Sequence, residues 1–439
     1  MSMSTSHNDP NLSLLARART LINKDELQEA ALVLNQARAQ APNDPRVFMM
    51  AGLMAEKAGN ITGAFQLMLR GTQMDPKWAP GFVELAQLNA RQGQFTEAKE
   101  AAEQAAKLAP QDFQVLGDLV QTAYLVHDLA LAARYLRRML ALQPDRTNLQ
   151  RQLANCLSKQ GQHAEALELW NTTIARNPRD TEALLGRTRT SLAIGQLKQA
   201  IADTAALLEL EPESRIYEYY AARARGQTPA QQPIELNQEI FDGAAKEFDH
   251  LLVNALKYQL PKQVASRLLA AHPDKKFNLL DLGCGTGLLG ASLGRIAGQL
   301  DGIDISQKMI EQAQRLKLYN HLQTIDLDSA LKAASETFYN AITALDVLVY
   351  AGDPSSVIFN SERLLAPAGQ LILSCEAAPE EGPDLVLNAV TERYAHKLSH
   401  VEKLCRAANF ETVETEHTTL RYEKGEPVKG FVIYARKRS

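Results

Sequence analysis

The chain is poor in cysteine and in long apolar runs. Four cysteines occur among 439 residues, at Cys156, Cys284, Cys375 and Cys405, and no two of them form a C-x-x-C pair. This spacing argues against a zinc site and against a disulfide framework. The first residues, MSMSTS, lack the apolar core of a signal peptide, and no run reaches the length of a membrane span. We therefore expect a protein of the reducing cytoplasm, with no metal and no membrane attachment.

Charge of one sign is also lacking. The chain has 47 lysines and arginines against 51 aspartates and glutamates, a formal net charge of -4. This balance gives no indication of a nucleic-acid partner. A hydrophobic content of 45% is ordinary for a globular protein, and the length suggests two or more domains.

A period of 34 residues runs through the first half of the chain. Prolines recur at Pro42, Pro76, Pro110, Pro144, Pro178 and Pro212, and alanines at Ala30, Ala64, Ala98, Ala132, Ala166 and Ala200. A third position holds Gly59, Gly93, Gly161 and Gly195, with Asp25 and His127 in the equivalent places. The glycine suits a turn between two helices, the alanine a close helix crossing, and the proline a helix stop. Each unit is therefore predicted to be a helical hairpin.

A helical hairpin of this length resembles the tetratricopeptide repeat (TPR). We expect a disordered tail over residues 1–8, then an array over 9–225 with six repeats and a final helix at 213–225. That last helix is either a cap or a truncated seventh repeat. Stacked repeats form a superhelix with a concave groove. The resemblance implies a protein or peptide ligand in the groove, and the alternative is a scaffold that dimerises or steadies an enzyme.

A change of composition marks a second domain. Residues 226–240 begin with GQTPAQQP, which predicts a linker before a domain at 241–439. Strands are expected at 277–282, 300–305, 322–325, 341–346 and 370–375, and helices at 287–297, 306–316, 328–334 and 354–365. A longer helix is expected at 384–408, and a terminal hairpin at 411–421 and 428–437. This alternation predicts a mostly parallel sheet with helices on both faces.

The stretch from 279 to 306 carries the chemistry. It reads LLDLGCGTG, then an apolar helical run, then GIDIS. Gly283, Gly285 and Gly287 on a strand-to-helix turn let a ligand approach the backbone. Asp304, at the tip of the next strand, can accept hydrogen bonds from a ribose diol. Together these residues predict a crevice for an adenosine-type cofactor.

The G-x-G-x-G spacing resembles class I S-adenosylmethionine (SAM) methyltransferases, whose sheet has seven strands and a Rossmann-like form. The spacing disfavours another class of enzyme, a nicotinamide-dependent reductase. The resemblance implies SAM as the cofactor, with Asp304 on the ribose and Ile305 and Met309 against the adenine. Asp281 either reaches the methionine ammonium or holds the turn by accepting backbone N–H groups, and Cys284 is a small spacer.

Residues at the ends of the later strands complete the implied site. Asp326 and the backbone of Leu327 are expected at the adenine, and Asp328 as the cap of the next helix. Asp346, Val347 and Tyr350 follow the fourth strand, where the resemblance places the transferred methyl group. Tyr258 and Phe241 are expected either to form a lid over the cofactor or to pack a helix on the sheet.

A general base is needed only for a protonated acceptor. Candidate bases are His396, Tyr350, Asp353 and Glu376. His396 is expected on the helix after the fifth strand, either in the acceptor pocket or on the surface. The methyl acceptor itself is not predicted.

Seven segments of the chain together resemble one known family. FDGAAKEFD, LKYQLP, LDLGCGTGLLG, GIDIS, LYNHL, LDVLVYAGD and RYAHKLSHVEKL occur in this order. They are similar to the predicted TPR-repeat methyltransferases, a mostly bacterial group. The resemblance implies an enzyme that methylates a protein, or a small molecule held by a carrier. A SAM-binding interaction scaffold without turnover remains the alternative.

Overall fold

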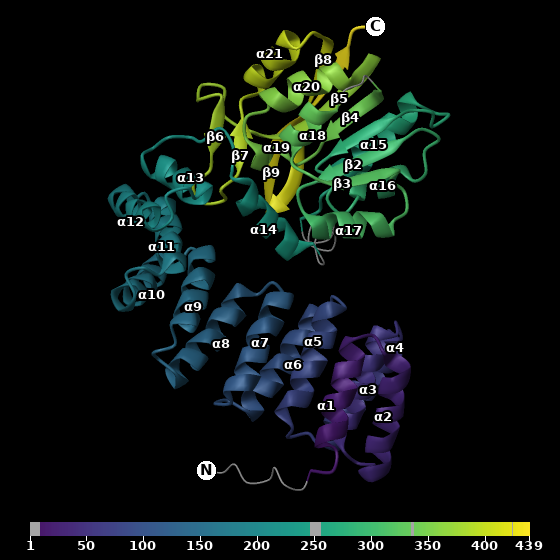
Figure 1. Ribbon diagram of the computed structural model, residues 1–439, viewed down its shortest axis with the longest axis vertical. Coiled ribbons are helices and arrows are strands. Elements are labelled where there is room, and N and C mark those ends of the chain that lie inside the picture. Colours follow the sequence, from purple (N-terminus) through teal and green to yellow (C-terminus); the bar gives the residue numbers. More distant parts are fainter. Residues whose placement is uncertain (1–8, 246–255, 335–337, 424) are drawn as a thin grey trace. The chain divides into compact units, whose positions relative to one another are not determined.

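A computed structural model describes residues 9–245, 256–334, 338–423 and 425–439 (Figure 1). The predicted tail at 1–8 lies outside these residues. By its contacts the chain divides into two compact units, Met1–Thr190 and Ser191–Ser439. In the described ranges, no helix has the length and apolar character needed to cross a membrane.

Paired helices with the predicted period fill the first part of the chain. The first helices of the pairs are α1 (Leu12–Asn23), α3 (Pro45–Lys57), α5 (Ala79–Arg91), α7 (Phe113–Leu125), α9 (Thr147–Lys159) and α11 (Thr181–Ala193). The second helices are α2 (Leu27–Gln40), α4 (Ile61–Met74), α6 (Phe95–Leu108), α8 (Leu129–Leu142), α10 (His163–Arg176) and α12 (Leu197–Leu210). Each second helix begins 34 residues after the one before it, which confirms the repeat.

The residues at the three periodic positions have the structural roles that we predicted. All six alanines are 0% exposed, because each lies where two helices cross closely. The four glycines, with Asp25 and His127, have φ between +54° and +80° and form the turn inside each hairpin. Each proline follows the end of a second helix by two residues and stops it.

Helix α13 (Arg215–Ala224) occupies the final helix that we predicted. It starts 34 residues after α11, in the place of the first helix of a seventh repeat. The segment predicted as a linker is only partly irregular, because α14 (Ile234–Ala244) takes up its second half. Residues from Ser191 onward keep the repeat positions but group by contacts with the α/β domain, so the predicted array end at 225 stays a prediction.

The second domain is built on one sheet. Among the described residues it has nine strands in the order β3-β2-β1-β4-β5-β7-β6, with β9 paired to both β5 and β8. The strands are β1 (Leu279–Leu282), β2 (Leu300–Asp304), β3 (His321–Thr324), β4 (Tyr339–Ala344), β5 (Leu365–Ala377), β6 (Leu385–Leu387), β7 (Tyr394–His396), β8 (Phe410–Glu423) and β9 (Glu426–Lys437). Strands β1 to β5 are parallel, and the predicted antiparallel pair β8–β9 joins the sheet beside β5.

Helices cover both faces of this sheet. They are α15 (Leu260–Ala271), α16 (Leu288–Leu293), α17 (Gln307–Arg315), α18 (Leu327–Ala333), α19 (Leu348–Ala351), α20 (Ser355–Leu364) and α21 (Leu398–Ala407). Successive side chains of a strand point to opposite faces. Leu280 and Leu282 therefore pack with α18, α20 and α21, whereas Leu279 packs with α15 and α16.

The predicted helix at 384–408 is wrong over its first half. The short antiparallel strands β6 and β7 occupy that half, and α21 begins only at Leu398. The side chain of Asn388 accepts hydrogen bonds from Val390 N and Thr391 N, both at 2.9 Å, and so forms a turn. An asparagine turn of this kind competes with helix formation, which explains the difference.

Candidate active site

A cavity of about 740 Å³ lies at the carboxyl ends of the parallel strands. Sheets of this type bind ligands at that edge. Of the site residues predicted from the sequence, Gly287, His396 and the candidate base Glu376 do not line the cavity. Those that line it are Tyr258, Asp281, Gly283, Cys284, Gly285, Asp304, Ile305, Met309, Asp326, Leu327, Asp346, Val347 and Tyr350.

The glycine turn fits tightly against the segment after β4. Gly283 has φ +66°, and a Cβ on it would lie 2.4 Å from Val347 Cγ2. Gly285 N donates to Asp304 Oδ2 at 2.9 Å, so the turn is tied to the end of β2. Burial raises the pKa of the Cys284 thiol well above its usual range. A protonated thiol is a poor nucleophile, which agrees with a spacer role for Cys284.

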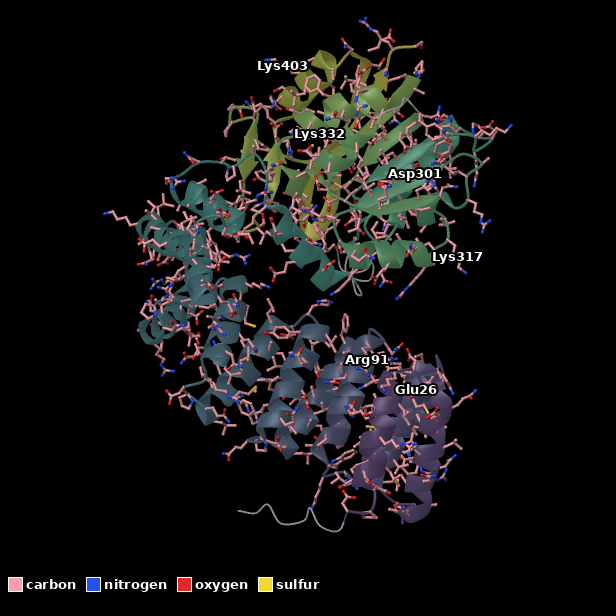
Figure 2. All side chains as sticks on the ribbon, in the orientation of Figure 1. Glu26, Arg91, Asp301, Lys317, Lys332 and Lys403 are labelled. Atoms are coloured by element: carbon pink, nitrogen blue, oxygen red, sulfur yellow. The ribbon has the colours of Figure 1, made fainter. Side chains whose placement is uncertain are left out.

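Asp304 is held by backbone amides. Its second oxygen, Oδ1, accepts from Ser306 N at 2.8 Å, and the residue is 8% exposed. Burial raises the pKa of this carboxyl, while the Ser306 and Gly285 amides oppose that rise. A carboxylate has about four acceptor sites, so two remain for a ligand. Asp301, labelled in Figure 2 on the same strand, accepts from the Tyr339 hydroxyl at 2.8 Å and does not line the cavity.

Asp281 accepts hydrogen bonds from two hydroxyl groups. Tyr319 Oη donates at 2.8 Å and Thr343 Oγ1 at 2.9 Å, and burial raises the pKa of Asp281 to about 6. The alternative that Asp281 holds the turn through backbone N–H groups is therefore wrong for the described residues. No role was predicted for Tyr319, which lies in the segment LYNHL. A Cβ on Gly290 would come within 2.6 Å of its ring, so this helix glycine makes room for the tyrosine.

The roles predicted for two aspartates after β3 are partly exchanged. Asp326, not Asp328, caps α18, because its Oδ1 accepts from Ser329 N at 2.9 Å. Asp328 accepts instead from the Ser356 hydroxyl. Both side chains line the cavity, so a contact between Asp326 and adenine stays a prediction.

Aromatic residues form the wall of the cavity nearest α14. The rings of Phe241 and Tyr350 meet edge to face, with centroids 5.0 Å apart. Asp242, also on α14, accepts from the Ser306 hydroxyl at the first turn of α17. Tyr258 is 6% exposed and packs with α15 and α16. The helix α14 thus contacts both the end of β2 and the segment after β4.

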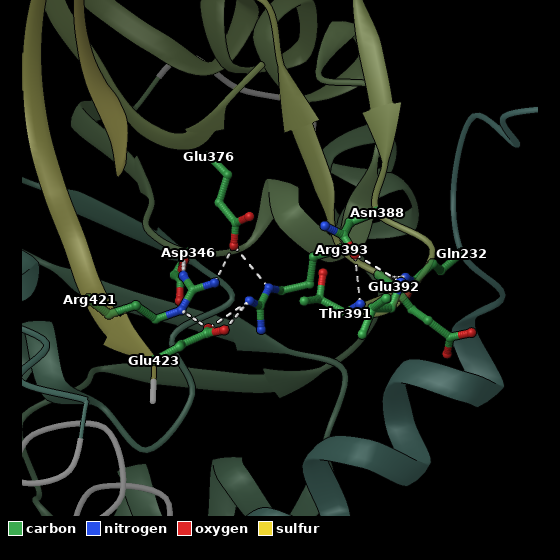
Figure 3. A network of polar contacts seen from close by, with 10 residues as sticks. Gln232, Asp346, Glu376, Asn388, Thr391, Glu392, Arg393, Arg421 and Glu423 are labelled. Atoms are coloured by element: carbon green, nitrogen blue, oxygen red, sulfur yellow. Dashed lines mark hydrogen bonds and ion pairs between the residues drawn. The ribbon is translucent and has the colours of Figure 1, made fainter. Parts of the chain in front are cut away.

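A group of five charged residues lies at another wall, and we call it the Arg421 cluster (Figure 3). Its members are Asp346, Glu376, Arg393, Arg421 and Glu423, and all but Glu376 line the cavity. Arg421 donates to Asp346 Oδ1 at 2.6 Å, to Glu423 Oε1 at 2.8 Å and to Glu376. Arg393 donates to Glu376 Oε1 at 2.9 Å and to Glu423 Oε2 at 2.6 Å.

Arg421 is the buried centre of the cluster, and the backbone of Asp346 is unusual. The side chain of Arg421 is 3% exposed, and Asp346 has φ +59°, which is rare for a residue other than glycine. Burial raises the pKa of Asp346, and Arg421 opposes that rise. Of the five residues the sequence pointed to Asp346 and Glu376 alone, because Arg421 is 75 residues away from Asp346.

His396 lies apart from the cavity. It is on β7, not on a helix, its side chain is fully buried, and Nε2 lies 2.7 Å from Gly352 O. Burial lowers the pKa of His396, which favours the neutral imidazole. The expectation that His396 lines the acceptor pocket is therefore wrong. Gly287 has φ +90° and begins α16, so its part is to shape the turn.

Family models match both parts of the chain. A model described as a methyltransferase domain matches residues 280–371, and tetratricopeptide repeat models match residues 15–77, 83–147 and 123–183. The second half of the sheet and the segment with Arg393 and Arg421 lie outside the methyltransferase match.

Curated relatives match a part of the chain. The ubiquinone biosynthesis O-methyltransferase of Xanthomonas oryzae pv. oryzae (strain PXO99A) is 32% identical over 22% of this chain and 41% of its own length. The protein with the same name from Thiobacillus denitrificans is 28% identical over 32% of this chain and 66% of its own length. The alignments thus span less than two thirds of these relatives.

Two solved structures each match less than half of the chain. Magnesium protoporphyrin IX methyltransferase from Synechocystis PCC 6803 gives a TM-score of 0.38 at 21% identity, over 46% of this chain and 99% of that one. YrrB, a TPR protein, gives 0.36 at 16% identity, over 44% of this chain and 97% of that one.

Proposed function

Because residues 280–371 match a methyltransferase domain and the chain before them holds TPR repeats, we propose that this protein is a SAM-dependent methyltransferase. The observation that carries the proposal is the joint lining of one cavity by the glycine turn, Asp304 and the segment after β4. The repeat array, in this proposal, binds a protein or peptide that is the substrate or brings it.

The residues of the cavity fit SAM better than a dinucleotide. The described lining residues include seven carboxylates and only two cations, Arg393 and Arg421, both in the Arg421 cluster. Next to the glycine turn the cavity therefore offers no basic side chain to a pyrophosphate. SAM carries a sulfonium and an ammonium and no phosphate, so an acidic lining favours it.

Each lining group would then have a definite part. Asp304 would receive the ribose diol, Ile305 and Met309 would pack against the adenine, and Asp281 would face the ammonium. The cofactor, when bound, supplies a methyl group on a positively charged sulfur. Asp346 and Tyr350 would line the place where that methyl group meets its acceptor. Transfer is an in-line displacement, so alignment by these walls supplies much of the acceleration.

Two finer statements belong to the same proposal. We place the protein in the cytoplasm, in keeping with four cysteines that are all free thiols. We also expect turnover, whereas a SAM-binding scaffold would use the same cavity without it. Labelled SAM, added with the protein to lysate from a strain that lacks it, separates the two, because only an enzyme transfers the label.

Calorimetry on the full chain tests the cofactor directly. We expect SAM and its demethylated product to bind and NAD to give no heat of binding. Binding of NAD without binding of SAM would overturn the proposed function.

A further inference from the structure

Only one of the two carboxylate oxygens of Asp346 accepts a hydrogen bond from a described residue. Oδ1 accepts from Arg421, and the backbone N–H donates to Ser374 Oγ at 2.8 Å. Among the described residues, no donor approaches Oδ2. The side chain is 16% exposed and lines the cavity directly before Val347, which packs on the glycine turn. A hydrogen-bond acceptor is therefore open at the junction of the cofactor end and the Arg421 cluster.

The surroundings of this oxygen are negative in sum. The Arg421 cluster joins three carboxylates to two guanidinium groups, so its formal charges sum to a negative value although each carboxylate is paired. The described lining residues as a whole include seven carboxylates against two arginines, with neither lysine nor histidine among them. A cavity with charge of one sign attracts ligands of the opposite sign and repels those of its own.

The neighbouring walls are apolar. Leu345 and Val347 flank Asp346 in the chain, and they line the same cavity as Ile240 and the edge-to-face pair of Phe241 and Tyr350. An acceptor would thus meet an acidic end between hydrophobic sides. This combination suits a cation on an apolar or aromatic stem and penalises a carboxylate or a phosphate.

We propose that the methyl acceptor is an amine carried on an apolar stem, and that Asp346 Oδ2 receives its N–H. The inference rests on the proposed function and deepens it. The ammonium gives a proton to Asp346 Oδ2, and the nitrogen lone pair then forms the N–C bond. The C–S bond breaks and its electron pair stays on sulfur, which becomes a neutral thioether. The product is an N-methyl ammonium group, and the proton on Asp346 passes to solvent.

Small probes test this assignment on the full chain loaded with S-adenosylhomocysteine. Benzylamine, benzyl alcohol and benzoate share one ring and differ in charge, and calorimetry or ligand-observed NMR measures their affinities. We expect benzylamine to bind at least about tenfold more tightly than either of the others. Equal affinities, tighter binding of benzoate, or no binding of benzylamine would overturn the proposal.

Two charge-matched variants locate the effect. Asp346→Asn should remove the preference for benzylamine, whereas Asp328→Asn, which also removes one lining charge, should keep it. An equal loss in both would mean that only the total charge matters and would overturn the role of Asp346. SAM binding to the unaltered chain is measured in parallel. If SAM does not bind, the proposed function fails; if SAM binds and the amine preference is absent, this inference alone fails.

Discussion

The two ends of the cavity hold their carboxylates in different ways. At the glycine end, Asp304 and Asp281 are bound by backbone amides and by hydroxyl groups, all of them neutral donors. At the other end, Asp346 and its neighbours are bound by two guanidinium groups. The first arrangement requires a backbone that places its amides correctly, and the second requires positive and negative side chains that offset one another. The two ends should therefore respond to different kinds of substitution.

The largest effect is expected from removing the central cation. Arg421→Met would remove a buried guanidinium and leave three half-buried carboxylates with one cation, and breaking a buried ion pair costs about 3–5 kcal/mol of stability. The loss should shrink as the pH falls, because the carboxylates then take up protons. Chemical denaturation at pH 7 and pH 5 measures both effects.

The matched control for that variant is Arg406→Met. The side chain of Arg406 is 61% exposed and pairs with Glu402 on the surface of α21, so its loss should cost less than about 1 kcal/mol. Similar losses for Arg421 and Arg406 would remove the contrast between the two ends of the cavity.

The next largest effect concerns the buried proton of Asp281. The folded chain keeps this proton up to a pKa of about 6, whereas an aspartate in the unfolded chain has its ordinary pKa of about 3.9 and loses the proton earlier. Between these values the folded state binds the extra proton, so stability falls as the pH rises. Relative to Asp281→Asn, the unaltered chain should lose up to about 3 kcal/mol between pH 4 and pH 6. A constant difference between the two proteins over this range would contradict the burial of a titrating group.

A smaller effect isolates the close fit of the glycine turn. Gly283 and Gly195 both have a positive φ, +66° and +74°, but a Cβ on Gly195 would meet nothing within 4 Å. Gly195→Ala should cost about 1–2 kcal/mol for its positive φ alone. Gly283→Ala should cost about 1–3 kcal/mol more, because its methyl group enters Val347. Equal costs, measured by thermal or chemical unfolding, would show that the turn is not tightly packed.

The same contrast explains what the sequence could predict. The repeat and the glycine turn are local patterns, in which residues a few positions apart determine the geometry. Gly283, Gly285 and Asp304 could therefore be assigned to one crevice from spacing alone. The methyltransferase resemblance then added Asp326 and Asp346, at later strand ends that meet at the same edge of the sheet.

Such local patterns could not predict contacts between residues that are far apart in the sequence. Arg421 reaches Asp346 from a strand 75 residues later, and nothing in the local sequence of β8 indicates that partner. His396 was misplaced because the turn at Asn388 converts a helix-like run into a hairpin. The exchange of Asp326 and Asp328 has a simpler cause, since either residue could cap a helix whose start is uncertain by two positions.

In the proposed function, the glycine end of the cavity binds SAM through Asp304. Calorimetry on variants of the full chain measures this contribution. Asp304→Ala should weaken SAM binding by about 1–3 kcal/mol, because charge-assisted hydrogen bonds to the ribose are lost. Asp301→Ala, on the same strand but outside the cavity, should leave the affinity within about threefold, since it removes no cofactor contact. Unchanged SAM affinity in the Asp304 variant, or equal weakening in both, would contradict the account.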